Sequence, residues 1–234
     1  MAKHNLCLLI GNSRWHWGIY QNKEWNLNSK VINQKNIHNN DLSSILWAAV
    51  GEIPLSTNLN DKKRILTENI PIINFPKWIG VDRALAAYAA ISRFTINSRS
   101  DNLLIVDAGT VMSLTLINKN GTFLGGQLIP GMKTQISAMI NNTKNLNGSN
   151  LIKVPKELFP KDTISAMHKG VAQAIIGAIN LASENNKNQI VLTGGDGKTI
   201  YQEISKYNQN SIYIPHLALN GLVELLEKKH PIAN

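Results

Sequence analysis

Apolar and polar positions alternate along this chain in blocks that predict short buried strands separated by helices. Continuous apolar runs bounded by turn residues are typical of strands buried on both faces, and they occur at residues 6–10, 103–106, 189–192 and 211–214. Apolar residues at helical spacing predict helices over residues 84–94, 132–140, 164–179 and 217–227. A further helix is predicted over residues 41–50, with Asp41 as its N-cap. Strands that alternate with helices in this way indicate an α/β fold.

The stretch at residues 102–117 is the most informative hairpin of the pattern. Asp107 closes an apolar strand, Ala108, Gly109 and Thr110 form a tight turn, and residues 111–117 return as a second strand. A carboxylate at a strand end beside a small-residue turn can hold a metal ion next to a phosphate, because glycine lets the backbone approach the ligand. Asp and Gly are equally common in ordinary turns. Both a phosphate loop and a plain hairpin therefore stay open for this stretch.

The same arrangement occurs near the N-terminus. Residues 6–10 form an apolar run, Gly11, Asn12 and Ser13 a turn, and residues 15–20 a returning strand. A repeat separated by about a hundred residues indicates two similar α/β lobes. We place the lobes at residues 1–100 and 101–234, and we expect a nucleotide to lie in a cleft between them.

The start of the helix at residues 84–94 carries a second candidate site. Gly80 permits a close approach of the backbone, and Asp82 and Arg83 follow it directly. Asp82 can also be a plain first-turn acid that favours the helix dipole, with Arg83 a solvated charge. Asp162 and Thr163, which precede the helix at residues 164–179, also have either a structural or a functional interpretation. Either residue can cap that helix, or Thr163 and the helix start can receive an anionic group.

Composition narrows the class of protein. The net charge of +9 comes from scattered basic residues, which argues against nucleic acid. The charge suits small anions such as ATP and carboxylates, or it simply reflects the low count of acidic residues. No apolar run reaches 18 residues, so no membrane span is expected. The single cysteine, Cys7, excludes an internal disulfide, is expected in the core, and fits a reducing compartment such as the cytoplasm.

Four motifs in a fixed order resemble the type III pantothenate kinases, a family that catalyses the first step of coenzyme A synthesis. The resemblance runs from Leu6 to about Leu226. It rests on GNS at 11–13, GVDR at 80–83, DAGT at 107–110 and GGQLIPG at 125–131, with support from DTISAMHKG at 162–170 and TGGDG at 193–197.

The resemblance implies a fold and a reaction. The fold is that of the actin and sugar-kinase superfamily, with two ribonuclease-H-like lobes whose mixed sheets are flanked by helices. The reaction is ATP-dependent transfer of a phosphoryl group to the primary hydroxyl of pantothenate. The implied cofactors are ATP, Mg²⁺ and a monovalent cation (K⁺ or NH₄⁺). The implied assembly is a cytoplasmic homodimer with the site at its interface.

Individual residues match the motifs of that family. Asp82 matches the general base, as an exposed aspartate with an ordinary pKa of about 3.9. Asp107 matches the ligand of the monovalent cation, Thr110 an ATP contact, and Thr163 a pantothenate contact made across the dimer. The pantothenate motif matches Gly80, Val81, Asp82 and Arg83. The N-terminal phosphate loop matches Leu9, Ile10, Gly11, Asn12, Ser13, Arg14, Trp15 and His16.

The chain departs from the family pattern at the first loop. That loop usually reads Asp-x-Gly-Asn-Thr, and here Leu9 stands at the aspartate. The usual carboxylate helps to hold the metal of ATP, which Leu9 cannot do. Magnesium keeps several waters and phosphate oxygens as ligands, so the loss can be tolerated. Arg14, where Asn is common in the family, can add a charge near the phosphates or face solvent. Phe75 is the nearest candidate for the usual aromatic contact with pantothenate.

Two other functions compete with this interpretation. One is a kinase or phosphatase of the same superfamily that acts on another small alcohol, against which the GVDR motif argues. The other is a protein that keeps the family fold, has weakened or lost catalysis, and acts in binding or regulation. Leu9 and the basic charge motivate the second alternative.

Overall fold

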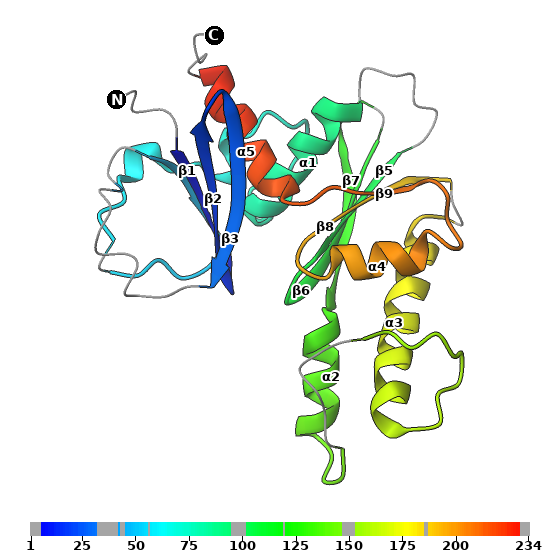
Figure 1. The fold of residues 1–234 in the computed structure, drawn as a ribbon. Helices are drawn as coiled ribbons and strands as arrows, with labels where there is room; N and C mark the ends of the chain where they lie inside the picture. The colour runs from blue at the N-terminus through cyan, green and yellow to red at the C-terminus, as the bar shows by residue number, and fades with distance from the viewer. Residues whose placement is uncertain are drawn as a thin grey trace. The chain divides into compact units, whose positions relative to one another are not determined.

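The protein is organised around one four-stranded sheet and one five-stranded sheet. The computed structural model describes residues 6–31, 42, 45–55, 57–94, 102–118, 120–146, 153–184 and 187–229. The chain divides into two units (Figure 1). Unit 1 contains residues 1–99, 120–123 and 216–234, and unit 2 contains residues 100–119 and 124–215. The expected division at residue 100 differs from this one at the C-terminus, because the last helix belongs to unit 1.

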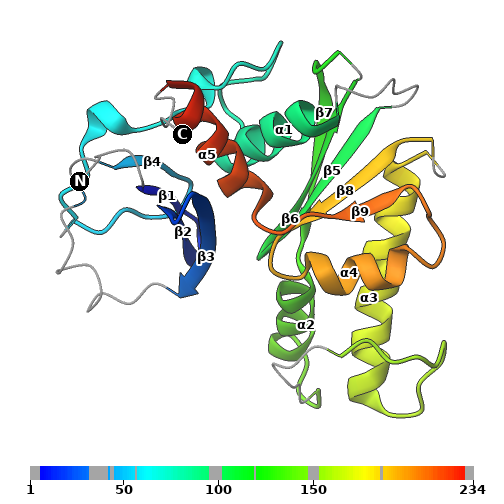
Figure 2. The ribbon, with the colours of Figure 1, turned by 45° about the horizontal axis from the view of Figure 1, so that its top comes forward.

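Unit 1 is built on a sheet with strand order β3-β2-β1-β4. β1 runs antiparallel to β2 and parallel to β4. Two helices, α1 and α5, lie side by side in this unit (Figure 2). The strands are β1 (Leu6–Ile10), β2 (Arg14–Gln21), β3 (Glu24–Val31) and β4 (Leu46–Ala49), and the helices are α1 (Val81–Phe94), α5 (Leu217–Lys229) and the 3-10 turns η2 (Asp61–Lys63) and η3 (Thr67–Asn69).

Unit 2 repeats this plan with strand order β7-β6-β5-β8-β9. β5 runs antiparallel to β6 and parallel to β8. The strands are β5 (Leu103–Ala108), β6 (Val111–Ile117), β7 (Phe123–Pro130), β8 (Gln189–Thr193) and β9 (Ser211–Tyr213), and the helices are α2 (Met132–Asn141), α3 (Thr163–Ala182) and α4 (Gly197–Ile204). The hairpin repeat expected from the sequence is confirmed, since β1 and β2 pair in the same sense as β5 and β6.

Each unit has its own apolar core. In unit 1, Leu8 and Ile10 of β1 pack with Trp15 of β2 and with Trp47 of β4. Cys7 is fully buried in the same strand, as expected for a core residue. Burial raises the pKa of the Cys7 thiol to about 12, so the thiol stays protonated. In unit 2, the core joins β5, β6 and β8 to α2, α3 and α4.

The helix predicted over residues 41–50 is wrong. Residues 46–49 form strand β4, which pairs in parallel with β1 from Cys7 to Ile10. A short apolar run cannot be assigned to a helix or a strand from its periodicity alone. Here the neighbouring strand determines the structure, because the backbone of Leu46–Ala49 pairs with the edge of β1 that β2 leaves open. Asp41, the expected cap, lies outside the described residues.

The other predicted helices are found with small changes at their ends. α1 begins at Val81 and α3 at Thr163. Of the two candidate caps of α3, Asp162 is the one used, because its side chain accepts a hydrogen bond from the backbone N–H of Ser165 (2.9 Å). No helix in the described part of the chain has the length and apolar character to cross a membrane.

Candidate functional site

The first loop follows β1 in unit 1. The N–H of Gly11 donates to the carbonyl of Arg14 (2.9 Å), which closes the turn between β1 and β2. The carbonyl of Ile10 accepts from the N–H groups of Val50 (3.0 Å) and Gly51 (3.3 Å). A Cβ at Gly51 would collide with the carbonyl of Gly11. The turn after β4 is therefore packed directly on the first loop.

Burial divides the predicted loop residues into two sets. Asn12, Ser13 and Arg14 are exposed and can meet a ligand with their side chains. The side chains of Leu9, Ile10 and Trp15 lie in the core. His16 is half-buried, and its Nε2 would lie 3.3 Å from a Cβ at Gly11. Leu9 is only 4% exposed and pairs with His16 across the β1–β2 ladder.

The second predicted motif lies at the start of α1. Oδ1 of Asp82 accepts a hydrogen bond from the backbone N–H of Arg83 (2.8 Å), and the carbonyl of Gly80 accepts from the same group (3.1 Å). Asp82 is half-buried, so the expectation of an exposed carboxylate is wrong. Burial raises the pKa of Asp82, and the N–H and the charge of Arg83 oppose that rise. Burial also lowers the pKa of Arg83, against the charge of Asp82.

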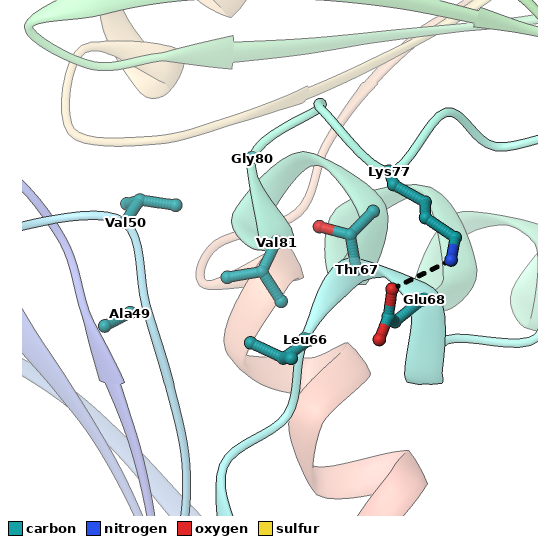
Figure 3. A pocket seen from close by; sticks show the side chains of 8 residues that line it. All are labelled: Ala49, Val50, Leu66, Thr67, Glu68, Lys77, Gly80 and Val81. Carbon is teal, nitrogen blue, oxygen red and sulfur yellow. Dashed lines mark ion pairs between the residues drawn. The ribbon is translucent and has the colours of Figure 1, made fainter. Parts of the chain in front are cut away.

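A pocket of about 390 Å³ opens beside this helix start (Figure 3). Gly80 and Val81 form one wall of it and Val50 lies on another, so residues of the predicted motif line the pocket. Glu68 and Lys77 form an ion pair at 3.2 Å between exposed side chains. The remaining lining residues are Ala49, Leu66 and Thr67.

Sequence reasoning missed this pocket because its walls come from separate loops. Thr67 is fixed there by a hydrogen bond from its hydroxyl to the carbonyl of Ile79 (2.7 Å). Glu68 belongs to the 3-10 turn η3 and Lys77 lies nine positions later in the loop before α1, and no periodic pattern connects them. Phe75, the candidate aromatic contact, instead packs against Phe123 with ring centroids 5.0 Å apart.

The third predicted motif is the turn between β5 and β6 in unit 2. Asp107 pairs with Ser113 on one side and with Thr193 on the other. Gly194 follows Thr193 with φ +88°, and a Cβ there would lie 2.5 Å from Oδ1 of Asp107. Only glycine accepts both this dihedral angle and this contact without strain. The N–H of Asp196 donates to the carbonyl of Ala108 (3.0 Å). The DAGT and TGGDG motifs thus meet in space.

The GGQLIPG motif joins the same cluster from the other side. The carbonyl of Thr110 accepts from the N–H of Gly131 (3.0 Å) and from the hydroxyl of Thr134 (2.7 Å). A Cβ at Gly131 would collide with the carbonyl of Gly109, so glycine is required at this contact. Thr134 was not singled out in the sequence, because a threonine in the first turn of a helix carries no signal of its own.

Thr163 stands apart from the Asp107 turn within unit 2. It is exposed at the first position of α3. The N-terminal end of α3 is the end that lies away from the sheet of unit 2 (Figure 1). Asp162 beside it has a pKa lowered by its hydrogen bonds to Ser165. The single chain therefore gathers Asp107 and Thr110 with the glycine motifs but leaves Thr163 outside that group.

Comparisons with known proteins find the same family that these motifs resemble. A family model described as type III pantothenate kinase matches residues 61–184. A type III pantothenate kinase of Synechococcus elongatus is 26% identical over 247 aligned residues, which cover 95% of this chain and 96% of the relative.

Solved structures share the fold. A Campylobacter jejuni protein described as a Baf family transcriptional activator superposes with a TM-score of 0.66 at 24% identity, over 97% of this chain and 98% of its own. A Sinorhizobium meliloti protein described as a 2-dehydro-3-deoxygalactonokinase superposes with a TM-score of 0.60 at 9% identity, over 98% of both chains. At such identities both likenesses concern the fold alone, and they agree with the actin and sugar-kinase fold that the sequence predicts.

Proposed function

The chain belongs to the type III pantothenate kinase family, and from that membership we propose that it transfers the terminal phosphoryl group of ATP to the primary hydroxyl of pantothenate. This reaction is the first step of coenzyme A synthesis. The cytoplasm is the location that we infer from membership of the family. The observation that carries the proposal within the structure is the start of α1, where Asp82 and Arg83 follow directly on the wall of a pocket. A volume of about 390 Å³ falls in the range of small-molecule sites.

Asp82 has the properties of the general base for this transfer. Burial raises the pKa of its carboxyl, which makes the carboxylate a better proton acceptor than an exposed aspartate. The pantothenate oxygen would form a bond to the γ-phosphorus while the bond from that phosphorus to the bridging oxygen breaks and ADP leaves. The hydroxyl proton would pass to Asp82. Phosphoryl transfer depends mainly on alignment and charge neutralisation, so a carboxylate suffices as the base.

Arg83 is the proposed partner of the pantothenate carboxylate. Its guanidinium offers a planar fork of donors that fits a carboxylate by two contacts. Gly80 and Val81 would border the remainder of the substrate in the pocket. Thr163 lies in the other unit at an exposed helix start, and we propose that it serves a second copy of the chain in a homodimer.

The turn from Asp107 to Thr110 is the proposed site for ATP and for a monovalent cation. A carboxylate at a strand end beside a tight turn can hold K⁺ or NH₄⁺, and Asp107 supplies the negative charge. A bound monovalent cation would neutralise phosphate charge there. Magnesium would arrive with ATP, and the first loop does not fit it as a ligand, because Leu9 is apolar and buried. Among the described residues no three His, Cys, Asp or Glu side chains gather as a metal site.

Asp82→Asn tests the proposal in a steady-state assay with ATP, K⁺ and pantothenate. Loss of the base is expected to reduce kcat by about 10²- to 10⁴-fold while ATP affinity stays near that of the unchanged protein. Asp61→Asn is the matched control, since Asp61 is exposed in a separate 3-10 turn of the same unit. Near-normal turnover by the Asp82 variant would remove the base assignment. ATP binding without turnover by the unchanged protein would favour a binding or regulatory role.

A further inference from the structure

Three side chains from separate parts of unit 1 meet beside the first loop. Nδ1 of His16 lies 2.7 Å from the hydroxyl oxygen of Ser29, and the same oxygen lies 3.2 Å from Nδ1 of His216. The two imidazole rings contact edge to face, with centroids 6.4 Å apart. Ser29 stands opposite His16 in the β2–β3 ladder, and His216 directly precedes α5.

The position of His16 relates this cluster to the first loop. Its ring edge at Nε2 faces Gly11 of that loop, because a Cβ built on this glycine would lie 3.3 Å from Nε2 and 3.0 Å from the carbonyl oxygen of Arg14. In the β1–β2 ladder His16 lies opposite Leu9, where the family pattern has a carboxylate. The polar group that this chain has at that place is therefore an imidazole on β2 instead of a carboxylate on β1.

His16 is a neutral imidazole at neutral pH. Its pKa is lowered to about 4, first by burial and then by the positive charges of His216 and Arg14. Burial lowers the pKa of His216 as well. A neutral imidazole donates from one nitrogen and accepts at the other, so the partner of Nδ1 decides what Nε2 can do.

The serine hydroxyl has a single proton to give. Nδ1 of His16 is the closer of the two nitrogens, and Ser29 can donate its proton to it. The N–H of His216 can then donate to the same serine oxygen, so that each of the three side chains has a hydrogen-bond partner. His16 then carries its own proton on Nε2, toward Gly11. The reverse chain satisfies the same groups but would point a lone pair at Gly11, which would repel a phosphate oxygen.

His216 is held in place by a backbone conformation that few residues adopt. Its φ of 55° is left-handed, and its carbonyl accepts the N–H of Asn220 in the first turn of α5 (2.9 Å). Residues held in such conformations often occur at functional sites. The left-handed backbone here orients the imidazole of His216 toward the hydroxyl of Ser29.

We propose that Ser29 and His216 are positioning residues that fix His16 in the Nε2–H form, so that His16 donates a hydrogen bond to a phosphate oxygen of ATP at the first loop. The inference rests on the proposed use of ATP, but it concerns nucleotide binding and not the transfer step. It assigns to this chain a direct donor to phosphate in place of a carboxylate that holds the metal.

The first experiment reads the imidazole itself. Long-range ¹H–¹⁵N spectra of the histidine-labelled full chain at pH 7 give the protonation of each ring nitrogen, and His16→Gln identifies the signals of His16. We expect the Nε2–H form, and a change at that N–H when a non-hydrolysable ATP analogue is added. A mixture of both forms, or a His16 signal that the analogue does not move, would overturn the proposal.

The second experiment removes the serine hydroxyl. Ser29→Ala is expected to raise the KM for ATP about tenfold, the effect of weakening one hydrogen bond to a charged ligand, while the KM for pantothenate stays unchanged. Ser29→Thr keeps a hydroxyl and should restore both the KM and the Nε2–H signal. Ser92→Ala is the matched control, because it removes a hydroxyl bonded to Glu224 near the other end of α1. A normal KM for ATP in Ser29→Ala would overturn the proposal.

The two proposals fail in different ways. A chain that binds the analogue at His16 but does not phosphorylate pantothenate would contradict the proposed function and support this inference. A chain that phosphorylates pantothenate with its His16 signals unmoved by the analogue would contradict only the inference.

Discussion

The turn between β1 and β2 and the turn between β5 and β6 join strands of the same order and sense, yet they present different side chains. Leu9 and Asp107 are each the next-to-last residue of their strand. Leu9 pairs with His16 and Ala48, whereas Asp107 pairs with Ser113 and Thr193. One scaffold thus supports a buried apolar residue opposite an imidazole in unit 1 and a carboxylate among hydroxyls in unit 2.

This difference shows that the strand framework and the ligand chemistry of a repeat can change independently. The ladder fixes where a side chain stands, because register determines face and depth. It does not determine the sign of the charge there. In unit 1 the groups near the turn are the cation Arg14 and the imidazole of His16, which we propose for phosphate. In unit 2 Asp107 suits a cation.

Of the changes that test this comparison of the two turns, the largest effect is expected from removing the charge of the unit 2 turn. Asp107→Asn keeps the size of the side chain but loses the negative charge that would attract a monovalent cation. We expect turnover to fall about 10²- to 10³-fold and activation by K⁺ to disappear, which titration with KCl at constant ionic strength would measure. K⁺ activation that survives in this variant would contradict the assignment of Asp107.

Placing a carboxylate in the unit 1 turn should cost stability before it affects catalysis. Leu9→Asp removes a buried apolar side chain and buries a charge, so the free energy of unfolding should drop by about 2 to 4 kcal/mol in urea titrations. The new carboxylate would stand opposite His16 and raise the pKa of that imidazole. Leu9→Asn separates the effects of shape and charge. If His16→Gln lowers stability equally in the Leu9→Asp and unchanged backgrounds, the two positions do not interact.

Local patterns predicted much of this framework. The hairpins at β1–β2 and β5–β6, the start of α1 and the cap at Asp162 follow from short segments whose residues interact with near neighbours. β4 was misassigned because its structure depends on pairing with β1, some forty positions earlier in the chain.

The parts of the site that sequence did not predict all depend on contacts between distant segments. Ser29 and His216 are 187 positions apart and meet only because α5 returns to unit 1. The burial of Asp82 follows from tertiary packing, so its raised pKa could not be read from the GVDR motif.

A smaller effect is expected from the glycine that packs on Asp107. Gly194→Ala forces a side chain into a left-handed backbone and against the Asp107 carboxylate, so thermal or urea unfolding should show a loss of about 1 to 3 kcal/mol. Gly195→Ala is the control, because no heavy atom outside the neighbouring residues lies within 4 Å of a Cβ built there. Equal free energies of unfolding for the two variants would mean that the Asp107 turn accommodates the added methyl group without loss of stability.

A further expected effect is the pH dependence of stability that His16 contributes. Its pKa is about 4 in the folded protein and has an ordinary value of 6.5 when unfolded. Between these pH values the unfolded chain binds more protons, so the free energy of unfolding should fall as the pH drops from about 6.5 toward 4. Urea midpoints of the unchanged protein and of His16→Gln, compared from pH 7 to pH 4.5, isolate this contribution from that of other titrating groups. The difference between the two proteins should change with pH in that window, because only one of them can take up the proton at position 16. A constant difference would mean that the imidazole of His16 is as easily protonated in the folded protein as in water, and that the fold does not favour its neutral form.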